Sequence, residues 1–175
     1  MSFQKYVLKI KIVDESVRPY YEAAIKKLNT EEYLFDYHKD SGFDLYIPDS
    51  KQYLFQNNDT KLIDLGIQCA AYHYLIPTMK VPNPQAFCVY PRSSIYKTCF
   101  RLANNVGIID SGYRGNLKAA FDCRFSSSEI YQMTLAPFSR LLQICMPNLT
   151  PFQVIIVDEL DETSRGEGGF GSTGK

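Results

Sequence analysis

Short apolar runs separated by turn-forming residues make up most of this chain after residue 40. The runs are rich in β-branched and aromatic residues, and Gly, Pro, Asn and Asp stand between them. Runs of this kind are typical of β-strands, and many short strands in one chain form a sandwich or a barrel. The sequence therefore predicts an all-β domain. The runs that carry this prediction are residues 44–47, 61–70, 85–90, 115–121, 131–135, 140–146 and 153–157.

The N-terminal part predicts one further strand and one helix. In residues 6–13, apolar side chains recur at every second position and so lie on one face of an extended chain, which indicates a half-buried strand. In residues 15–29, apolar side chains recur at three-to-four spacing behind a cap offered by Asp14 or Ser16. We expect a short amphipathic helix at about 15–29, inserted into the β domain, whose role the sequence leaves open.

Length and charge limit the classes of partner. A chain of 175 residues fits one domain. Lys and Arg together number 19, as do Asp and Glu, so the formal net charge is zero and we expect no direct nucleic-acid binding. No apolar run is long enough to span a membrane, and no leader is visible. We therefore expect a soluble intracellular protein, cytoplasmic or nuclear, without a membrane partner.

The cysteines and histidines offer little for a metal centre or a disulfide framework. The five cysteines are odd in number, and none stands in a Cys-x-x-Cys pair. The two histidines, His38 and His73, lie far apart in sequence, so a His-based nucleophilic triad also lacks material. We expect the cysteines to be reduced thiols in the core.

The last part of the chain differs from the rest. Apolar periodicity ends near residue 158, and five of the ten glycines lie within residues 166–174. We therefore expect a β domain over 1–157 and a mobile, glycine-rich C-terminal arm over 158–175. Closely spaced glycines let backbone amides approach an anion, and Phe170 has no core to join unless it covers a flat group such as a nucleobase.

Two segments in the second half of the chain offer groups that suit a nucleotide. Pro91-Arg-Ser-Ser94 provides a guanidinium, two hydroxyls and turn amides, which suit a phosphate. Residues 104–115 have an apolar and acidic centre with glycines at both sides, which indicates a hairpin that could offer its backbone to a planar ligand. Within it, Asp110 is followed three residues later by the aromatic ring of Tyr113.

Taken together and in order, five segments resemble the five motifs of the trimeric deoxyuridine triphosphatases (dUTPases). The resemblance implies a distorted jelly-roll-like β-barrel and a homotrimer with active sites shared between subunits. It also implies Mg²⁺-assisted hydrolysis of dUTP to dUMP and pyrophosphate, which keeps uracil out of DNA and supplies dUMP for thymidylate synthesis. The five segments are Ser41-Gly-Phe-Asp-Leu45, Pro91-Arg-Ser-Ser94, Gly107-Ile-Ile-Asp-Ser-Gly-Tyr-Arg-Gly115, Arg140-Leu-Leu-Gln143 and Arg165-Gly-Glu-Gly-Gly-Phe-Gly-Ser-Thr-Gly174.

The resemblance implies three roles close to the chemistry. Asp110 would orient and activate the water that attacks the α-phosphorus. Tyr113 would pack under the deoxyribose and leave no room for a 2′-hydroxyl. Asp44 would support the water shell of Mg²⁺, which would be held mainly by the phosphates. For the side chain alone, an aspartate that bonds its own turn explains Asp44 about equally well.

The resemblance also implies a set of substrate contacts. The α- and β-phosphate ligands would be Arg92, Ser93, Ser94 and Gln143. The uracil slot would use the main chain of Gly107, Ile108, Ile109 and Lys118, with Asn104 as a side-chain contact. The arm would hold the γ-phosphate and stack on uracil through Arg165, Gly171, Ser172, Thr173 and Phe170. Ser94 and Lys118 each replace a glycine that is common in the family, so their contacts are less well matched.

Two alternative functions remain open at this stage. A dCTP deaminase on the same fold would need a catalytic acid in the hairpin, where related deaminases carry Gly-aromatic-Glu-Gly and this chain has Gly112-Tyr-Arg-Gly115. Arg114 is always charged and is therefore unsuited to shuttling a proton. A regulatory protein that binds dUTP without turnover is the other alternative. The intact motifs favour catalysis.

Overall fold

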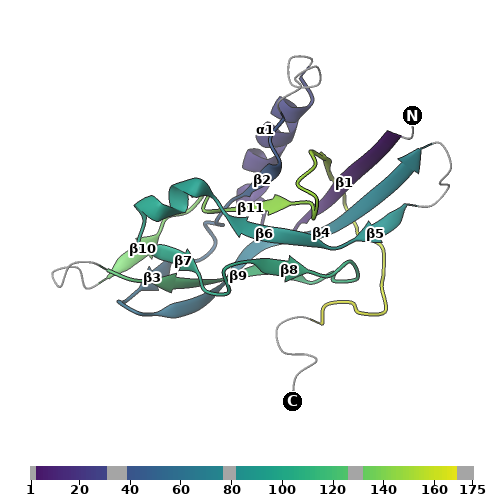
Figure 1. Cartoon of the computed structure of the whole chain (residues 1–175). Helices are drawn as coiled ribbons and strands as arrows, with labels where there is room; N and C mark the ends of the chain where they lie inside the picture. Colours follow the sequence, from purple (N-terminus) through teal and green to yellow (C-terminus); the bar gives the residue numbers. More distant parts are fainter. Residues whose placement is uncertain (1–2, 31–38, 77–81, 126–131, 169–175) are drawn as a thin grey trace.

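The computed structural model describes residues 3–30, 39–76, 82–125 and 132–168, and strands dominate it (Figure 1). Within these residues, the strands form a six-stranded sheet, a four-stranded sheet and a two-stranded ribbon. The predicted all-β class with one short helix is confirmed. In chain order the elements are β1 (Phe3–Ile12), the 3₁₀-helix η1 (Glu15–Val17), α1 (Arg18–Leu28), β2 (Gly42–Leu45), β3 (Tyr53–Phe55), β4 (Thr60–Ile76), β5 (Asn83–Gln85), β6 (Phe87–Pro91), the 3₁₀-helix η2 (Ser93–Lys97), β7 (Phe100–Leu102), β8 (Gly107–Ile109), β9 (Asn116–Cys123), β10 (Met133–Leu135), β11 (Leu142–Cys145) and β12 (Gln153–Ile156).

The two larger sheets share one core. The six-stranded sheet has the order β12-β1-β4-β9-β7 with β5 beside β4, and the four-stranded sheet has the order β2-β11-β6-β8. Buried residues of both belong to a single cluster, for example Ile10 and Phe121 from the first sheet and Leu45 and Ile144 from the second. Two sheets around one apolar core are the architecture that the strand pattern predicts.

Strand β1 is buried more completely than a half-buried strand. Leu8 and Ile10 are buried as the alternation predicts, but Val7 on the opposite face is also only 6% exposed. On that face Val7 stands opposite Tyr72 of the neighbouring strand β4, whose large side chain is also buried.

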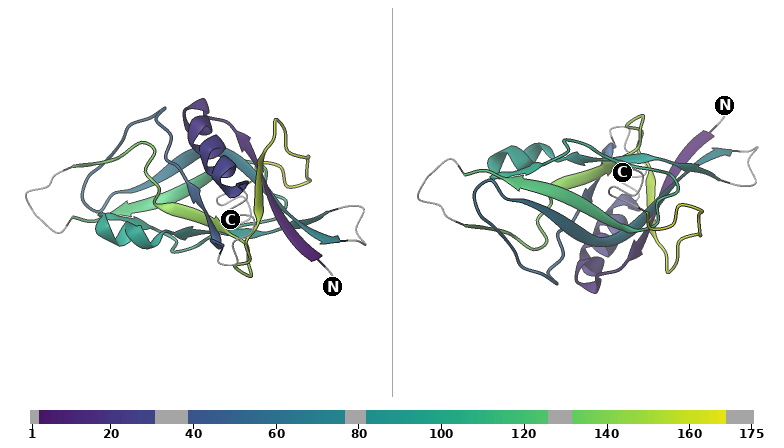
Figure 2. Two further views of the ribbon diagram at one scale, coloured as in Figure 1. Left: turned by 90° about the horizontal axis from the view of Figure 1, so that it is seen from above. Right: turned by 90° about the horizontal axis from the view of Figure 1, so that it is seen from below.

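The predicted helix is present as η1 followed directly by α1. The Asp14 carboxylate accepts a hydrogen bond from the Ser16 amide at 3.0 Å and so caps η1, and Pro19 stands in the first turn of α1. Tyr21 is fully buried, and its hydroxyl oxygen accepts a hydrogen bond from the Tyr46 amide at 3.3 Å. These contacts fix α1 next to β2, and from above the helix lies across the middle of the molecule (Figure 2).

A glycine in the long strand β4 makes room for the start of the helical segment. Gly66 has φ of +68°, where the register between β4 and β9 shifts. A Cβ atom at this position would lie 2.5 Å from Asp14 Cβ, and the Gly66 carbonyl accepts the Val13 and Asp14 amides, both at 2.9 Å. The bulge in β4 therefore positions the capping residue.

All five cysteines are free thiols, and Cys69, Cys123 and Cys145 are buried while Cys88 and Cys99 are half-buried. The prediction of core thiols is confirmed for the three buried residues. In the described part of the chain, no helix has the length and apolar character needed to cross a membrane.

Candidate active site

Three charged side chains meet where β2, β6 and β11 lie side by side. Asp44 lies in β2, Arg92 follows β6, and Arg140 precedes β11. Asp44 Oδ1 is 2.6 Å from Arg92 Nε, and Asp44 Oδ2 is 3.1 Å from Arg140 Nη1. Strand β11 creates this junction, because Gln143 pairs with Asp44 on one side and with Tyr90 on the other. The first, second and fourth predicted motifs are therefore neighbours. We call the three side chains Asp44, Arg92 and Arg140 the Asp44 cluster.

The glycine of the first motif makes space for the glutamine of the fourth. A Cβ atom at Gly42 would lie 2.1 Å from Gln143 Oε1, so the Gln143 side chain occupies the volume that any larger residue would need. Gln143 Nε2 donates a hydrogen bond to the Pro91 carbonyl at 3.4 Å. The amide of Gln143 thus lies between the first and second motifs.

The second motif is held by backbone contacts to the fourth. The Arg92 amide donates to the Leu141 carbonyl at 2.8 Å, and Arg92 Nη1 donates to the Arg140 carbonyl at 3.1 Å. Ser93 is exposed at the start of η2, whereas Ser94 is half-buried. The hydroxyl and guanidinium groups predicted to bind phosphate therefore stand on a braced turn.

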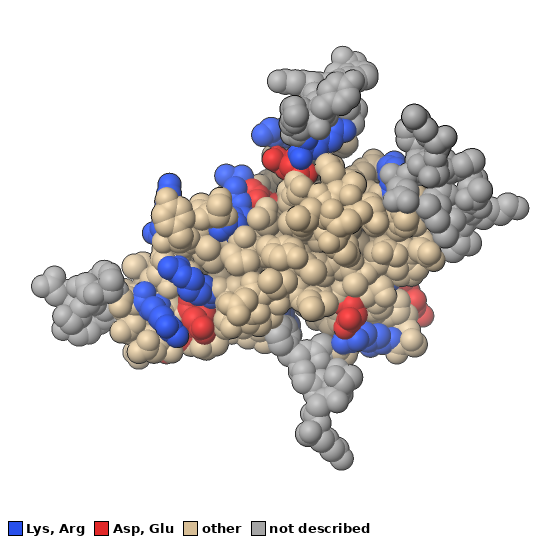
Figure 3. Space-filling model, viewed as in Figure 1, with Lys and Arg blue, Asp and Glu red and all other residues tan. Residues whose placement is uncertain are grey.

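A cavity of about 700 Å³ opens over the Asp44 cluster, which is a size typical of a site for a small ligand. The strand residues and turns that line it include Asp44, Arg92, Ser93, Arg140 and Gln143. Basic and acidic side chains lie next to each other beside α1 in Figure 3. We call this space the Asp44 cavity.

Burial and charge act in opposite directions on Asp44. Burial raises the pKa of the Asp44 carboxyl above its ordinary value, while the Arg92 and Arg140 guanidiniums favour the charged form. Since both carboxylate oxygens contact a guanidinium, the ion pairs offset part of the cost of burying the charge.

A second group of predicted residues lies in the turn after β8. Tyr113 donates its amide hydrogen to the Asp110 carbonyl at 3.0 Å, which closes the turn. The Tyr113 ring folds over Gly115, where a Cβ atom would lie 2.6 Å from the Tyr113 hydroxyl, and this hydroxyl donates to the Asn116 carbonyl at 2.8 Å. Burial raises the pKa of Tyr113, so it remains a neutral donor. We call this segment the Asp110 turn.

The chain after β12 returns to the Asp110 turn. Arg165 Nη1 lies 2.7 Å from Asp110 Oδ2. The Thr163 hydroxyl donates to the Gly112 carbonyl, and the Arg114 amide donates to the Gly166 carbonyl at 2.8 Å. The described part of the predicted arm is therefore docked on the turn that carries Asp110.

Arg114 anchors this docking. It is the one buried charged residue in the described part of the chain. Arg114 Nη2 is 3.2 Å from Asp161 Oδ1, and Nη1 donates to the Ser111 and Tyr113 carbonyls at 2.9 and 2.8 Å. The Tyr72 hydroxyl also bonds the Asp161 carboxylate. Although burial acts to raise it, the hydrogen bonds from Tyr72 and Arg114 hold the pKa of Asp161 below its ordinary value.

The residues predicted to read uracil lie on an edge strand. Strand β8 ends the four-stranded sheet, and Ile108 is 72% exposed. The predicted hairpin closed by the strand after Gly115 differs from the structure, because β8 pairs with β6 whereas β9 pairs with β4 and β7. Lys118 is exposed on β9, in the other sheet, and Asn104 is exposed in the turn before β8.

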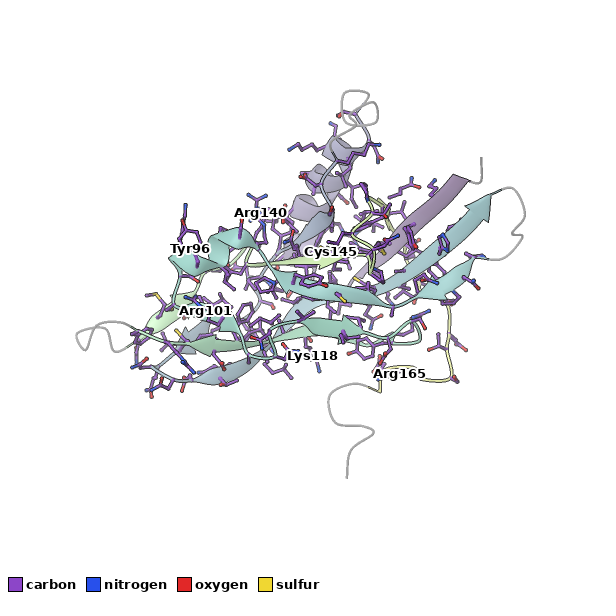
Figure 4. All side chains as sticks on the ribbon, in the orientation of Figure 1. Tyr96, Arg101, Lys118, Arg140, Cys145 and Arg165 are labelled. Carbon is purple, nitrogen blue, oxygen red and sulfur yellow. The ribbon has the colours of Figure 1, made fainter. Side chains whose placement is uncertain are left out.

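The Asp44 cluster and the Asp110 turn lie at opposite ends of β6. Phe87 at one end pairs with Ile109, which immediately precedes Asp110, whereas Arg92 follows the other end. An extended strand rises about 17 Å from Phe87 to Arg92. Figure 4 likewise shows Arg140 and Arg165 on opposite sides of the sheets. One chain therefore keeps the two groups apart.

Comparison with known families decides the assignment. A family model described as dUTPase matches residues 31–174. The chain belongs to the dUTPase family. The match includes the Asp44 cluster and the Asp110 turn, and it begins after α1.

Curated relatives carry the name deoxyuridine 5′-triphosphate nucleotidohydrolase. One from Escherichia phage T5 is 43% identical over 97 residues, which cover 55% of this chain and 63% of that relative. One from Idiomarina loihiensis is 34% identical over 137 residues, which cover 77% of this chain and 82% of the relative. The chain thus spans less than two thirds of the phage T5 relative and most of the bacterial one.

A solved dUTPase has the same fold. The dUTPase of Staphylococcus bacteriophage 80alpha, determined with dUPNHPP, matches with a TM-score of 0.53 and 18% identity over 96% of this chain and 98% of that chain. At this identity the likeness concerns the fold, and it confirms the predicted jelly-roll-like β architecture.

The structure locates some of the dUTPase motif residues and not others. Those of the first, second and fourth motifs form the Asp44 cluster, and those of the third form the Asp110 turn with Arg165 beside it. Phe170, Gly171, Ser172 and Thr173 lie outside the described residues. The mobility predicted for 158–175, and the division at 157, stay predictions.

Sequence reasoning missed the dUTPase residues that brace the site. The motif pattern assigns Arg140 no contact, and no local pattern links Arg114 to Asp161, because the two residues are 47 positions apart. One feature of the sequence points to the Arg114 contact. Arg114 stands between turn residues and an apolar strand, and a charged side chain that is buried at such a position needs a partner of opposite charge.

Proposed function

We propose that this chain hydrolyses dUTP to dUMP and pyrophosphate by attack of water on the α-phosphorus. The proposal implies protection of DNA from uracil and a supply of dUMP for thymidylate synthesis. The observation that carries it is the presence, within the family match, of a guanidinium-lined cavity at one end of β6 and the Asp110 turn at the other. The names of the curated relatives support the same substrate.

The phosphates are bound in the Asp44 cavity. The Arg92 guanidinium uses Nε for Asp44 and Nη1 for the Arg140 carbonyl, so these contacts orient its Nη2 without engaging it among the described residues. A pre-oriented guanidinium suits phosphate oxygens. The hydroxyls of Ser93 and Ser94 and the amide of Gln143 add neutral donors from the adjoining turn and strand.

Asp110 serves as the base. Arg165 contacts Oδ2, which leaves Oδ1 to accept the proton of the attacking water. A base in this position contributes about 10²–10⁴-fold to the rate when it lies within hydrogen-bond reach of the water. In the same turn, the Tyr113 ring sets the space for the sugar and excludes a 2′-hydroxyl.

The uracil is read at the exposed edge of β8. Backbone donors and acceptors of Gly107, Ile108 and Ile109 are those of an edge strand, which can pair with a planar polar group. Asn104, in the turn before β8, extends this edge, whereas Lys118 stands on β9 of the other sheet and would contribute its backbone as the family motif implies. Arg165 binds the γ-phosphate, with Gly171, Ser172 and Thr173 assisting it and Phe170 stacking on the base.

The family implies Mg²⁺, and the residues present fit an ion bound to the substrate. No group of three His, Cys, Asp or Glu side chains that could hold a metal ion occurs in the described ranges, and both Asp44 oxygens contact arginine. This donor set suits Mg²⁺ that is held by phosphates and water, with Asp44 touching the water shell. The ion would neutralise charge on the phosphate oxygens.

The active site is shared between subunits of a homotrimer. The distance between the Asp44 cluster and the Asp110 turn supports this proposal, because a single triphosphate cannot contact both groups of one chain. A second copy would bring its Asp110 turn to the Asp44 cavity of the first.

The test is release of pyrophosphate from dUTP with Mg²⁺, and the matched variant is Asp110→Asn. We expect the wild type to be active and the variant to lose about 10²–10⁴-fold in kcat. Ammonia release from dCTP would indicate the deaminase alternative, which the burial of Arg114 in its ion pair disfavours. Binding of dUTP without pyrophosphate release would indicate a regulatory protein.

A further inference from the structure

Helix α1 forms a wall of the Asp44 cavity. Ala24, Lys27 and Leu28 line the cavity, and their spacing places them on one helix face. The family match begins at residue 31, after this helix. The cavity proposed for phosphate therefore has a wall to which the family match assigns no role.

The wall is held in place without the help of Lys27. Tyr21 is fully buried against Phe43 and Tyr46, and Tyr20 stacks on Phe138 with ring centroids 4.3 Å apart. These aromatic contacts attach α1 to β2 and to the segment before β11. Lys27 is exposed in the last turn of the helix, so its ammonium is not needed for packing.

Lys27 decides the charge balance of the cavity. The described lining contains three cationic side chains, Lys27, Arg92 and Arg140, and two anionic ones, Asp40 and Asp44. Arg92 and Arg140 both pair with Asp44. Without Lys27 the described lining would have equal numbers of positive and negative groups, and would offer little net attraction to a polyanion.

We propose that Lys27 is a further substrate-binding residue, whose ammonium contacts the phosphate chain of the nucleotide in the Asp44 cavity. This inference rests on the proposed function, because it takes the cavity to be the phosphate site. The flexible stem of lysine delivers a point charge, which suits a terminal phosphate more than a fixed bidentate contact.

The test compares Lys27→Met with Lys26→Met. Lys26 is the neighbouring lysine on the same helix and does not line the cavity. We expect Lys27→Met to raise the KM for Mg-dUTP about fivefold or more, with a smaller change in kcat. Lys27→Arg keeps the charge and should stay close to wild type, as should Lys26→Met. The increase in KM should shrink as ionic strength rises.

Binding measurements separate this inference from the proposed function. The probes are dUPNHPP, which resists hydrolysis, inorganic tripolyphosphate, which carries no base, and dUMP, which carries one phosphate. Lys27→Met should weaken binding of the first two and leave dUMP binding nearly unchanged. A wild type that binds dUPNHPP without hydrolysing dUTP would refute the function and leave this test intact. Equal affinity of wild type and Lys27→Met for both polyphosphates would overturn the inference.

Discussion

Arg165 Nη1 and Asp110 Oδ2 form an ion pair at 2.7 Å. The pair joins the residue proposed for the γ-phosphate to the residue proposed as the base. Because the side chains of Arg165 and Asp110 are 40% and 52% exposed, the ion pair adds little to folding stability. Its consequence is functional: a triphosphate that binds Arg165 competes with Asp110 for the guanidinium.

Removal of the Arg165 guanidinium should therefore impair turnover and leave the fold intact. We expect Arg165→Gln to lower kcat/KM for dUTP by about 10–150-fold, the range for loss of one hydrogen bond to a charged group. The thermal unfolding midpoint should stay within about four degrees of wild type, since an exposed ion pair contributes at most about 1 kcal/mol. A large drop in the midpoint would show that the residue is structural.

The Arg114 anchor predicts that Asp161 controls the docking of the C-terminal segment. In Asp161→Asn, the amide of Arg114, which donates to the Gly166 carbonyl, should exchange its hydrogen faster. The amides of β4 and β9 should keep their wild-type exchange rates, which provides the internal control. Unchanged exchange at Arg114 would mean that Asp161 does not hold the segment.

The same anchor predicts a pH dependence with a definite sign. The pKa of Asp161 is lowered in the folded chain, so its contribution to stability is present above the ordinary carboxyl value, near 4, and is lost as pH falls through the lowered value. The difference in unfolding free energy between wild type and Asp161→Asn should therefore be constant near neutral pH and vanish in acid. A difference that grew as pH fell would contradict the assignment.

The contact between Gly42 and Gln143 predicts a non-additive pair of substitutions. In Gly42→Ala the new Cβ would displace the flexible end of Gln143, so the fold should survive while dUTP binding weakens. We expect about 10–150-fold loss in kcat/KM for Gly42→Ala and for Gln143→Ala, the range for loss of one hydrogen bond to a charged group such as phosphate. The double variant should lose no more than Gln143→Ala alone. Full additivity would show that Gly42 acts on something other than Gln143.

Sequence pattern predicted the elements whose partners are local. The Asp14 cap and the apolar spacing of 15–29 identified the helix, because capping and helix faces depend on residues a few positions apart. Alternation identified β1, although it missed the burial of Val7, which depends on strands far away in sequence.

Pattern could not predict contacts that depend on sheet register. The motifs named Asp44, Arg92 and Gln143, but only the pairing of β11 with β2 and β6 brings them together. The hairpin after Asn104 was wrong in its pairing, because β8 joins β6 and leaves β9 to the other sheet. Sequence pattern also could not predict that α1 forms a wall of the Asp44 cavity. The position of the helix depends on the burial of Tyr21, which is a long-range contact.

We propose that dUTP is hydrolysed at a site assembled from two chains. The most direct measurement is pyrophosphate release by trimers refolded from an equal mixture of Asp110→Asn and Arg92→Ala chains, with each variant and wild type assayed alone. Each variant alone should be nearly inactive, and the mixture should recover activity, since about a quarter of shared sites would combine an intact Asp110 turn with an intact Asp44 cluster. An inactive mixture, with mixed trimers confirmed by mass and an active wild type, would contradict the shared site. An inactive wild type would contradict the hydrolysis itself.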